Sequence, residues 1–248
     1  MSLPLILGVC VILVLAGIVK GASGMGLPTL GMGLLSLLMP PADAAAIIVV
    51  PAILTNVLQF TTGPRRGTVV RRFWPLGLCA IAGTLAGAFW LGGLQSHLAP
   101  ALLGGTLLVY GLFGLGKLHF RTPAGAEPWL SPLVGLISGF LTGTTGVTVM
   151  PVAPYLQSLG LDREDLVQSL GLAFTLSTFA LAVTLSLDFS ALTDTRLALA
   201  SLGALVPSFL GMEIGRRLRL AVSQETFRTG FFFALALLGA NTLVRTLL

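Results

Sequence analysis

Two glycine-rich breaks hold the residues of this sequence that are best suited to bind a small ligand. They are residues 17–28 (GIVKGASGMGLP) and residues 135–146 (GLISGFLTGTTG), and each opens with a Gly-x-x-x-Gly spacing inside an apolar segment. A helix that breaks at membrane depth exposes backbone N–H and C=O groups that hydrocarbon cannot satisfy. Such breaks persist only inside protein or beside a watery cavity, and a matched pair of them indicates a transporter binding site.

The two breaks offer different groups to an anion. In the first, Gly24 and Gly26 flank Met25, and their lack of a Cβ atom lets a ligand approach the backbone N–H groups of a half-helix. The alternative is close helix packing, which small residues often serve in membranes and which fits Gly17 and Gly21 better. The second break adds two hydroxyls, in the run Gly143, Thr144, Thr145 and Gly146.

Lys20 is a cation inside an apolar segment and away from the loops. A buried lysine beside a helix break is a natural partner for an anion. Its long apolar stem would equally let the ammonium group extend to the cytoplasmic surface if the segment runs deep. The sequence leaves both roles open.

Polar side chains follow each break on the next apolar segment. Thr55 and Gln59 are four residues apart and share a helical face, with Asn56 beside them. An amide in hydrocarbon is costly unless it is bonded or faces water. We therefore expect substrate contacts here and at Gln168 on the corresponding segment, or helix–helix hydrogen bonds worth about 1 kcal/mol or less. Hinges are expected at glycines and prolines around the breaks, namely Gly21, Pro28, Pro51, Gly139 and Pro151.

Composition places the chain in the membrane. Of its 248 residues, 55% are hydrophobic and 9% charged, with a mean hydropathy of +0.97, whereas soluble domains carry about 25% charged residues. The net charge of +5 and the pI of about 10.0 reflect arginine in cytoplasmic loops rather than nucleic-acid binding. No soluble domain is expected.

Catalysis, metal binding and cofactors are not indicated. Cys10 and Cys79 lie in apolar stretches without metal-ligand spacing, and His97 and His119 are isolated near segment ends. The apolar segments also lack a central acidic residue or histidine, so a carboxylate proton relay is not expected. Coupling to a weak-acid proton, to sodium or to the membrane potential alone all remain open.

The hydropathy pattern predicts an all-α polytopic membrane protein with six full spans and two broken hairpins. A span needs about 20 apolar residues. The spans are expected at residues 42–62, 74–94, 98–117, 166–187, 197–214 and 226–247, and the hairpins at residues 3–39 and 131–159.

Loop charges orient these elements. Three loops are basic, and the positive-inside rule places them in the cytoplasm and both termini outside. Each half then becomes a hairpin followed by three spans, and residues 1–121 and 122–248 form two inverted-topology repeats. The charges that fix this orientation are Arg65, Arg66, Arg71 and Arg72; Lys117 and Arg121; Arg216, Arg217 and Arg219; and, in an opposite loop, Asp188 and Asp194.

These motifs resemble the TauE/SafE (sulfite exporter) family of membrane permeases over nearly the whole chain. The resemblance rests on glycines 17, 21, 24 and 26, then residues 40–46 (PPADAAA), Pro51, Asn56 and Gln59. It recurs with glycines 135, 139, 143 and 146, Pro151, and residues 155–161 (YLQSLGL). One departure is Gly26-Leu27-Pro28, where the family often has three glycines.

The resemblance implies a transporter of small sulfur-containing or organic anions, such as sulfite or sulfoacetate, in a bacterial inner membrane. Our leading hypothesis is export by alternating access, with the anion between the two hairpins near the membrane midplane. The alternatives are an uptake permease coupled to protons or sodium, and a non-transport scaffold or assembly factor. Lipids and the anion are the expected partners, and glycine faces such as residues 83–87 leave open whether the chain forms a homodimer.

Overall fold

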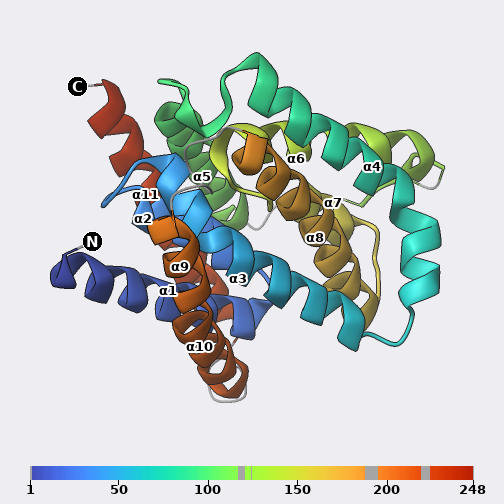
Figure 1. The fold of residues 1–248 in the computed structure, drawn as a ribbon. Coiled ribbons are helices and arrows are strands. Elements are labelled where there is room, and N and C mark those ends of the chain that lie inside the picture. The colour runs from blue at the N-terminus through green and yellow to red at the C-terminus, as the bar shows by residue number, and fades with distance from the viewer. Residues whose placement is uncertain (1, 117–120, 124, 188–194, 219–223, 248) are drawn as a thin grey trace.

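The computed structural model describes residues 2–116, 121–123, 125–187, 195–218 and 224–247, and this part of the chain is helical with no strand (Figure 1). Lys117, His119, Asp188, Asp194 and Arg219 lie outside the described residues. The helices are α1 (Leu3–Ser23), α2 (Leu27–Leu35), α3 (Pro41–Thr62), α4 (Arg66–Trp90), α5 (Ala99–Leu115), α6 (Glu127–Thr145), α7 (Val152–Ser158), α8 (Arg163–Leu187), α9 (Thr195–Gly203), α10 (Leu205–Leu218) and α11 (Gln224–Leu247), with a short 3-10 helix, η1 (Gly93–Gln95).

Membrane-spanning length and apolar composition recur along the chain. Six helical segments in the described residues are long and apolar enough to cross a bilayer, and α5 is a shorter apolar helix of 17 residues. They are α1, α3, α4, α8, the consecutive α9 and α10, and α11. The predicted class, an all-α polytopic membrane protein, is confirmed.

Both glycine breaks separate a long helix from a short one. Helix α1 ends at Gly24, whose φ of 77° is left-handed, and α6 ends at Gly146 with a φ of 72°. In each case the N–H of the glycine donates to a carbonyl four residues earlier, which closes the helix. Helix α2 has nine residues and α7 has seven, and at 1.5 Å per residue each is about 10–14 Å long, too short to cross a membrane.

Two predicted spans have different boundaries in the structure. The segment predicted at residues 197–214 consists of α9 and α10, which meet at Ala204. Pro207 explains this break, because it has no N–H to donate to Gly203 four residues earlier. Helix α4 begins at Arg66 rather than at residue 74, because the arginine-bearing loop residues form its first two turns.

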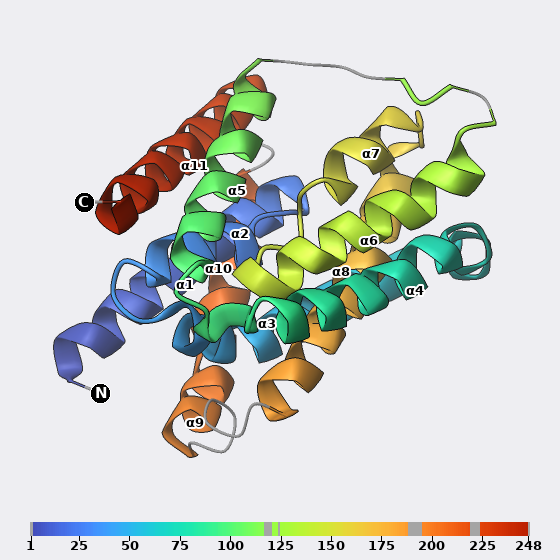
Figure 2. The same cartoon turned by 90° about the horizontal axis from the view of Figure 1, so that it is seen from above.

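The four most extensive helix pairs join one half of the chain to the other. Helix α4 packs along α6, α1 along α10, α5 along α11 and α3 along α8. Figure 2 shows α4 beside α6 and α5 beside α11. The inverted repeat is a prediction with which these pairings are compatible.

Glycine allows the closest of these approaches. A Cβ atom at Gly17 would lie 2.4 Å from the Ser208 carbonyl oxygen, and one at Gly21 would lie 2.0 Å from that of Met212. Gly139 and Gly143 of α6 meet carbonyl oxygens of α4 at 2.0 and 2.2 Å in the same way. The sequence favours close packing for Gly17 and Gly21, and the structure agrees. The sequence favours a site lining for Gly143, but this glycine also packs closely against a neighbouring helix.

We predict that Gly139→Ala destabilises the protein by roughly 1–3 kcal/mol, because the added methyl group overpacks a backbone contact. The matched control is Gly105→Ala on α5, where a Cβ atom meets nothing within 4 Å. Thermal unfolding of both variants in detergent is the measurement. Equal melting temperatures for Gly139→Ala and the parent would contradict the packing argument.

Candidate functional site

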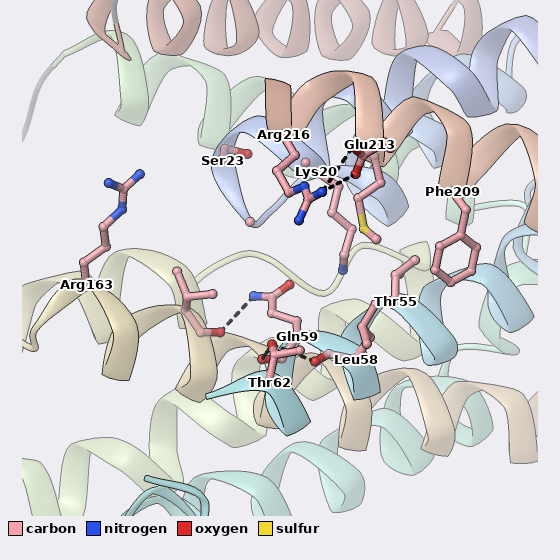
Figure 3. A pocket seen from close by; sticks show the side chains of 14 residues that line it. Lys20, Ser23, Thr55, Leu58, Gln59, Thr62, Arg163, Phe209, Glu213 and Arg216 are labelled. Atoms are coloured by element: carbon pink, nitrogen blue, oxygen red, sulfur yellow. Dashed lines mark hydrogen bonds and ion pairs between the residues drawn. The ribbon is translucent and has the colours of Figure 1, made fainter. Parts of the chain in front are cut away.

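A cavity of about 590 Å³ lies between α1, α3, α8 and α10 (Figure 3). Polar and charged groups mix with apolar ones around it, and its charged members are Lys20, Arg163, Glu213 and Arg216. The other lining residues are Gly21, Ser23, Gly24, Thr55, Leu58, Gln59, Thr62, Val167, Phe209 and Met212. The first glycine break therefore contributes directly to this cavity.

Lys20 is the buried charge of the cavity. It lies one turn before the end of α1, is only 3% exposed, and its ammonium group donates a hydrogen bond to Oδ1 of Asn56 on α3. Figure 3 shows the side chain reaching from α1 towards Thr55. The side chain thus turns into the helix bundle. It does not extend to the surface, which is the other orientation that the sequence allows.

Neither Lys20 nor Asn56 has its full complement of partners. Among the described residues, no carboxylate forms a salt bridge with Lys20. The carboxylate in the same cavity, Glu213, bonds instead to Arg216 and Arg217, at 2.9 Å each. The amide nitrogen of fully buried Asn56 has no hydrogen-bond partner. Both groups therefore have unused donors, and Lys20 lines the cavity while Asn56 adjoins it through this hydrogen bond.

The mouth of the cavity lies among arginines. Arg163 begins α8 and Arg216 lies in the last turn of α10, and both side chains are exposed. Arg65 forms an ion pair of 2.7 Å with Asp165, which lies two residues after Arg163 on α8. We call this part of the molecule, marked by Arg65, Arg163, Arg216 and Arg217, the arginine-rich end.

Comparison with known families gives a match over residues 9–242, to the family described as Sulfite exporter TauE/SafE. The chain belongs to the TauE/SafE family. No curated protein and no solved structure matches it. The family is one of membrane transporters of the sulfite or anion exporter type, and this TauE/SafE member is accordingly a multi-pass membrane transporter.

The two glutamines expected at the site brace α3 against α8 in this TauE/SafE protein. The Gln59 amide donates to the Val167 carbonyl oxygen at 2.8 Å while its side chain also lines the cavity. Gln168 is fully buried, donates to the Phe60 carbonyl oxygen at 2.9 Å and accepts from the Arg65 backbone N–H at 3.1 Å. Gln168 therefore fastens the turn after α3, outside the cavity that holds Lys20.

The residues of the second break lie elsewhere. Gly143 lines a different cavity, and Gly146 faces the Met32 side chain of α2. The hydroxyls of Thr144 and Thr145 donate to carbonyl oxygens of their own helix, at 3.1 and 2.6 Å. The structure thus places the two breaks on separate cavities.

The remaining predicted residues lie beside helix ends, except Pro51, which lies in the middle of α3. Met25 and Gly26 form the turn before α2, where Gly26 has a φ of 115° and Pro28 occupies the first turn. Pro51 lies within α3, and its carbonyl oxygen accepts from the Thr55 hydroxyl at 2.7 Å. Pro151 precedes α7. Their role as hinges is still a prediction.

Helix α10 supplies a lining that the sequence interpretation did not identify. The lining consists of Phe209 and the residues three, four and seven positions after it, which are Met212, Glu213 and Arg216. This spacing places all four on one helical face. That period was visible in the sequence, but nothing in the sequence indicated that the face turns towards Lys20. The sequence interpretation also did not identify Ser23, Thr62 and Arg163. Their place in the lining depends on how α1, α3 and α8 pack together, which no local pattern shows.

We predict that Gln168→Leu destabilises the protein by about 1–3 kcal/mol, because the Phe60 carbonyl and the Arg65 N–H lose their partner. Gln157→Leu is the matched control, since Gln157 is exposed on α7. Thermal unfolding in detergent compares the two. The brace is refuted if both substitutions shift the melting temperature equally.

Proposed function

We propose that this protein exports small sulfur-containing or organic anions, such as sulfite or a sulfonate like sulfoacetate, and binds them at Lys20 and Asn56. The observation that carries the proposal is a buried ammonium group that lines a cavity and pairs with no carboxylate among the described residues. The adjacent Asn56 amide nitrogen offers a second donor of the kind an anionic oxygen requires.

Electrostatics favour an anion in this position. A charged group taken out of water loses several kcal/mol of solvation unless a partner compensates it. An anion 4 Å from the ammonium would gain about 4 kcal/mol at an effective dielectric constant of 20. Lys20 by itself would thus be an incompletely compensated cation, and binding of an anion would relieve that cost.

The size of the cavity favours an anion with an organic body. A volume of about 590 Å³ far exceeds what one inorganic oxyanion fills, and Leu58, Val167, Phe209 and Met212 provide apolar lining among the polar groups. Small-ligand sites commonly combine an apolar lining with a few placed polar groups. A sulfonate with a short carbon chain would use both parts.

The arginines support export as the direction. By the positive-inside rule, the arginine-rich end would face the cytoplasm, so the cavity would admit anions from inside the cell. The membrane potential then favours anion exit by about 2.3 kcal/mol per charge per 100 mV. Uptake coupled to protons or sodium is the competing direction, and a scaffold without transport would have no need for a lysine beside a cavity.

Alternating access would expose the site to each side in turn. The two glycine breaks line separate cavities, so we place the anion beside the first break rather than between the two. Movement at α1 and α10, which pack together and carry Lys20 and Glu213, would change access to it.

We predict that Asn56→Asp abolishes binding and lowers anion flux at least tenfold while the protein stays folded. The new carboxylate would neutralise Lys20 internally and repel the substrate, at nearly unchanged shape. Flux into or out of proteoliposomes should be measured with sulfite, sulfonates, thiosulfate and dicarboxylates, with and without pH and sodium gradients. Ligand-induced thermal stabilisation gives an independent measure of binding.

Lys20→Gln should give the same loss, whereas Arg245→Gln, at an exposed position near the end of α11, should transport normally. Flux that survives in both Asn56→Asp and Lys20→Gln would refute the assigned site. A parent protein that transports none of the anions would refute the function itself. Dependence on an inward proton or sodium gradient would favour uptake over export.

A further inference from the structure

A second, smaller cavity lies at the end of the molecule opposite the arginine-rich end. It has a volume of about 260 Å³ and lies between α3, α4, η1, α6 and α8. Its lining begins at Ala42 in the first turn of α3 and reaches Thr184 near the end of α8. Among the described residues that line it, none carries a charge.

The helices around the two cavities pack in the same register. Two glycines of α6 approach carbonyl oxygens of α4, and two glycines of α1 approach carbonyl oxygens of α10 in the same way. Gly139 approaches Ala80 as Gly17 approaches Ser208. Gly143 approaches Thr84 as Gly21 approaches Met212. A first shift of 122 residues, as from Gly17 to Gly139, converts positions of α1 into positions of α6. A second shift of 128 residues, as from Ala80 to Ser208, converts positions of α4 into positions of α10. Glycines of α4 and α10 make the same contacts in the opposite direction, and these contacts obey both shifts. Gly83 approaches Leu136 as Gly211 approaches Val14. Gly87 approaches Phe140 as Gly215 approaches Ile18.

The same shifts convert the lining of one cavity into that of the other. Helices α3 and α8 begin at Pro41 and Arg163, which the first shift also relates. The cavity residues Gly21, Thr62 and Arg216 correspond in this way to Gly143, Thr184 and Ala88 of the smaller cavity. The two cavities thus occupy corresponding positions in the two halves of the chain.

We propose that the smaller cavity is the second opening of the pathway that leads to Lys20. The structure is then the form that is open to Lys20 at the arginine-rich end and closed at the other. This inference rests on the proposed anion transport. If the two halves of the chain exchanged conformations, the smaller cavity would open in the way the larger one is open in this structure.

Unsatisfied polar atoms lie at corresponding positions of α3 and α8. On α3, Asn56 follows Thr55, the residue at which the lining of the larger cavity ends towards Ala42, and its amide nitrogen has no partner. On α8, the buried Thr178 hydroxyl is likewise unpartnered and stands between Val167 and Thr184. The first shift relates Asn56 to Thr178, so these orphan groups mark corresponding positions on the path.

The two openings differ in charge. The shifts carry Lys20 to Thr142 and Arg216 to Ala88, so neutral residues occupy the positions that correspond to these cations of the larger cavity. The Thr142 hydroxyl is already bonded to the Ser138 carbonyl oxygen at 2.8 Å. An anion should therefore bind more weakly from this side, which lowers the rate of return transport without altering the equilibrium that the gradients set.

The test uses single cysteines in a Cys10→Ala/Cys79→Ala background. Thr184→Cys probes the smaller cavity and its counterpart Thr62→Cys probes the larger one, while Thr246→Cys, exposed near the end of α11, is the control outside both. Membrane vesicles of known orientation are treated with a membrane-impermeant methanethiosulfonate from one side at a time. Anion flux is measured for each variant before and after modification.

We expect Thr184→Cys and Thr62→Cys to react from opposite sides, and each modification to reduce flux at least tenfold. Modification of Thr246→Cys should leave flux unchanged, and half-saturation should need at least tenfold more anion at the Thr184 side. Full modification of Thr184→Cys without loss of flux, or no modification during turnover, would overturn the inference and leave the proposed function intact. Absence of flux in the parent would instead remove the proposed function.

Discussion

Backbone atoms of α1 and α10 approach one another at Gly17, Gly21, Gly211 and Gly215, where a Cβ atom would lie within 2.4 Å of a carbonyl oxygen. Association of membrane helices depends on van der Waals packing, because lipid is as apolar as the helices themselves. The glycines provide that packing, and α4 with α6 repeats the arrangement. Helices α1 and α10 contribute to the lining of the larger cavity, and α4 and α6 to that of the smaller one.

The glycine contacts also explain how a charge can be held within the bundle. Lys20 immediately precedes Gly21, so the contact that fixes α1 against α10 fixes the lysine as well. Its partner Asn56 is held by α3, which Gln59 and Gln168 fasten to α8. Each donor is therefore held by a packed pair of helices, which favours the precise placement of donors that anion binding requires.

Local sequence signals predicted the helices well because they depend on local physics. The left-handed caps at Gly24 and Gly146 terminate α1 and α6 inside the two predicted breaks. Boundaries failed where a single residue changed the local hydrogen bonding, as Pro207 does between α9 and α10. The role of Gln168 was inferred from the cost of an amide in hydrocarbon, which a backbone carbonyl relieves as well as a ligand does.

By itself, the sequence determined that this is an all-α membrane protein with two apolar segments broken at glycines and the motifs of one transporter family. Hydropathy, helix length and glycine spacing suffice for that, since each acts over a few turns of chain. Only the tertiary structure decided that Lys20 turns towards Asn56, that α10 lines their cavity and that the two breaks lie on separate cavities. Those relations depend on distances between helices far apart in the chain, which no local pattern encodes.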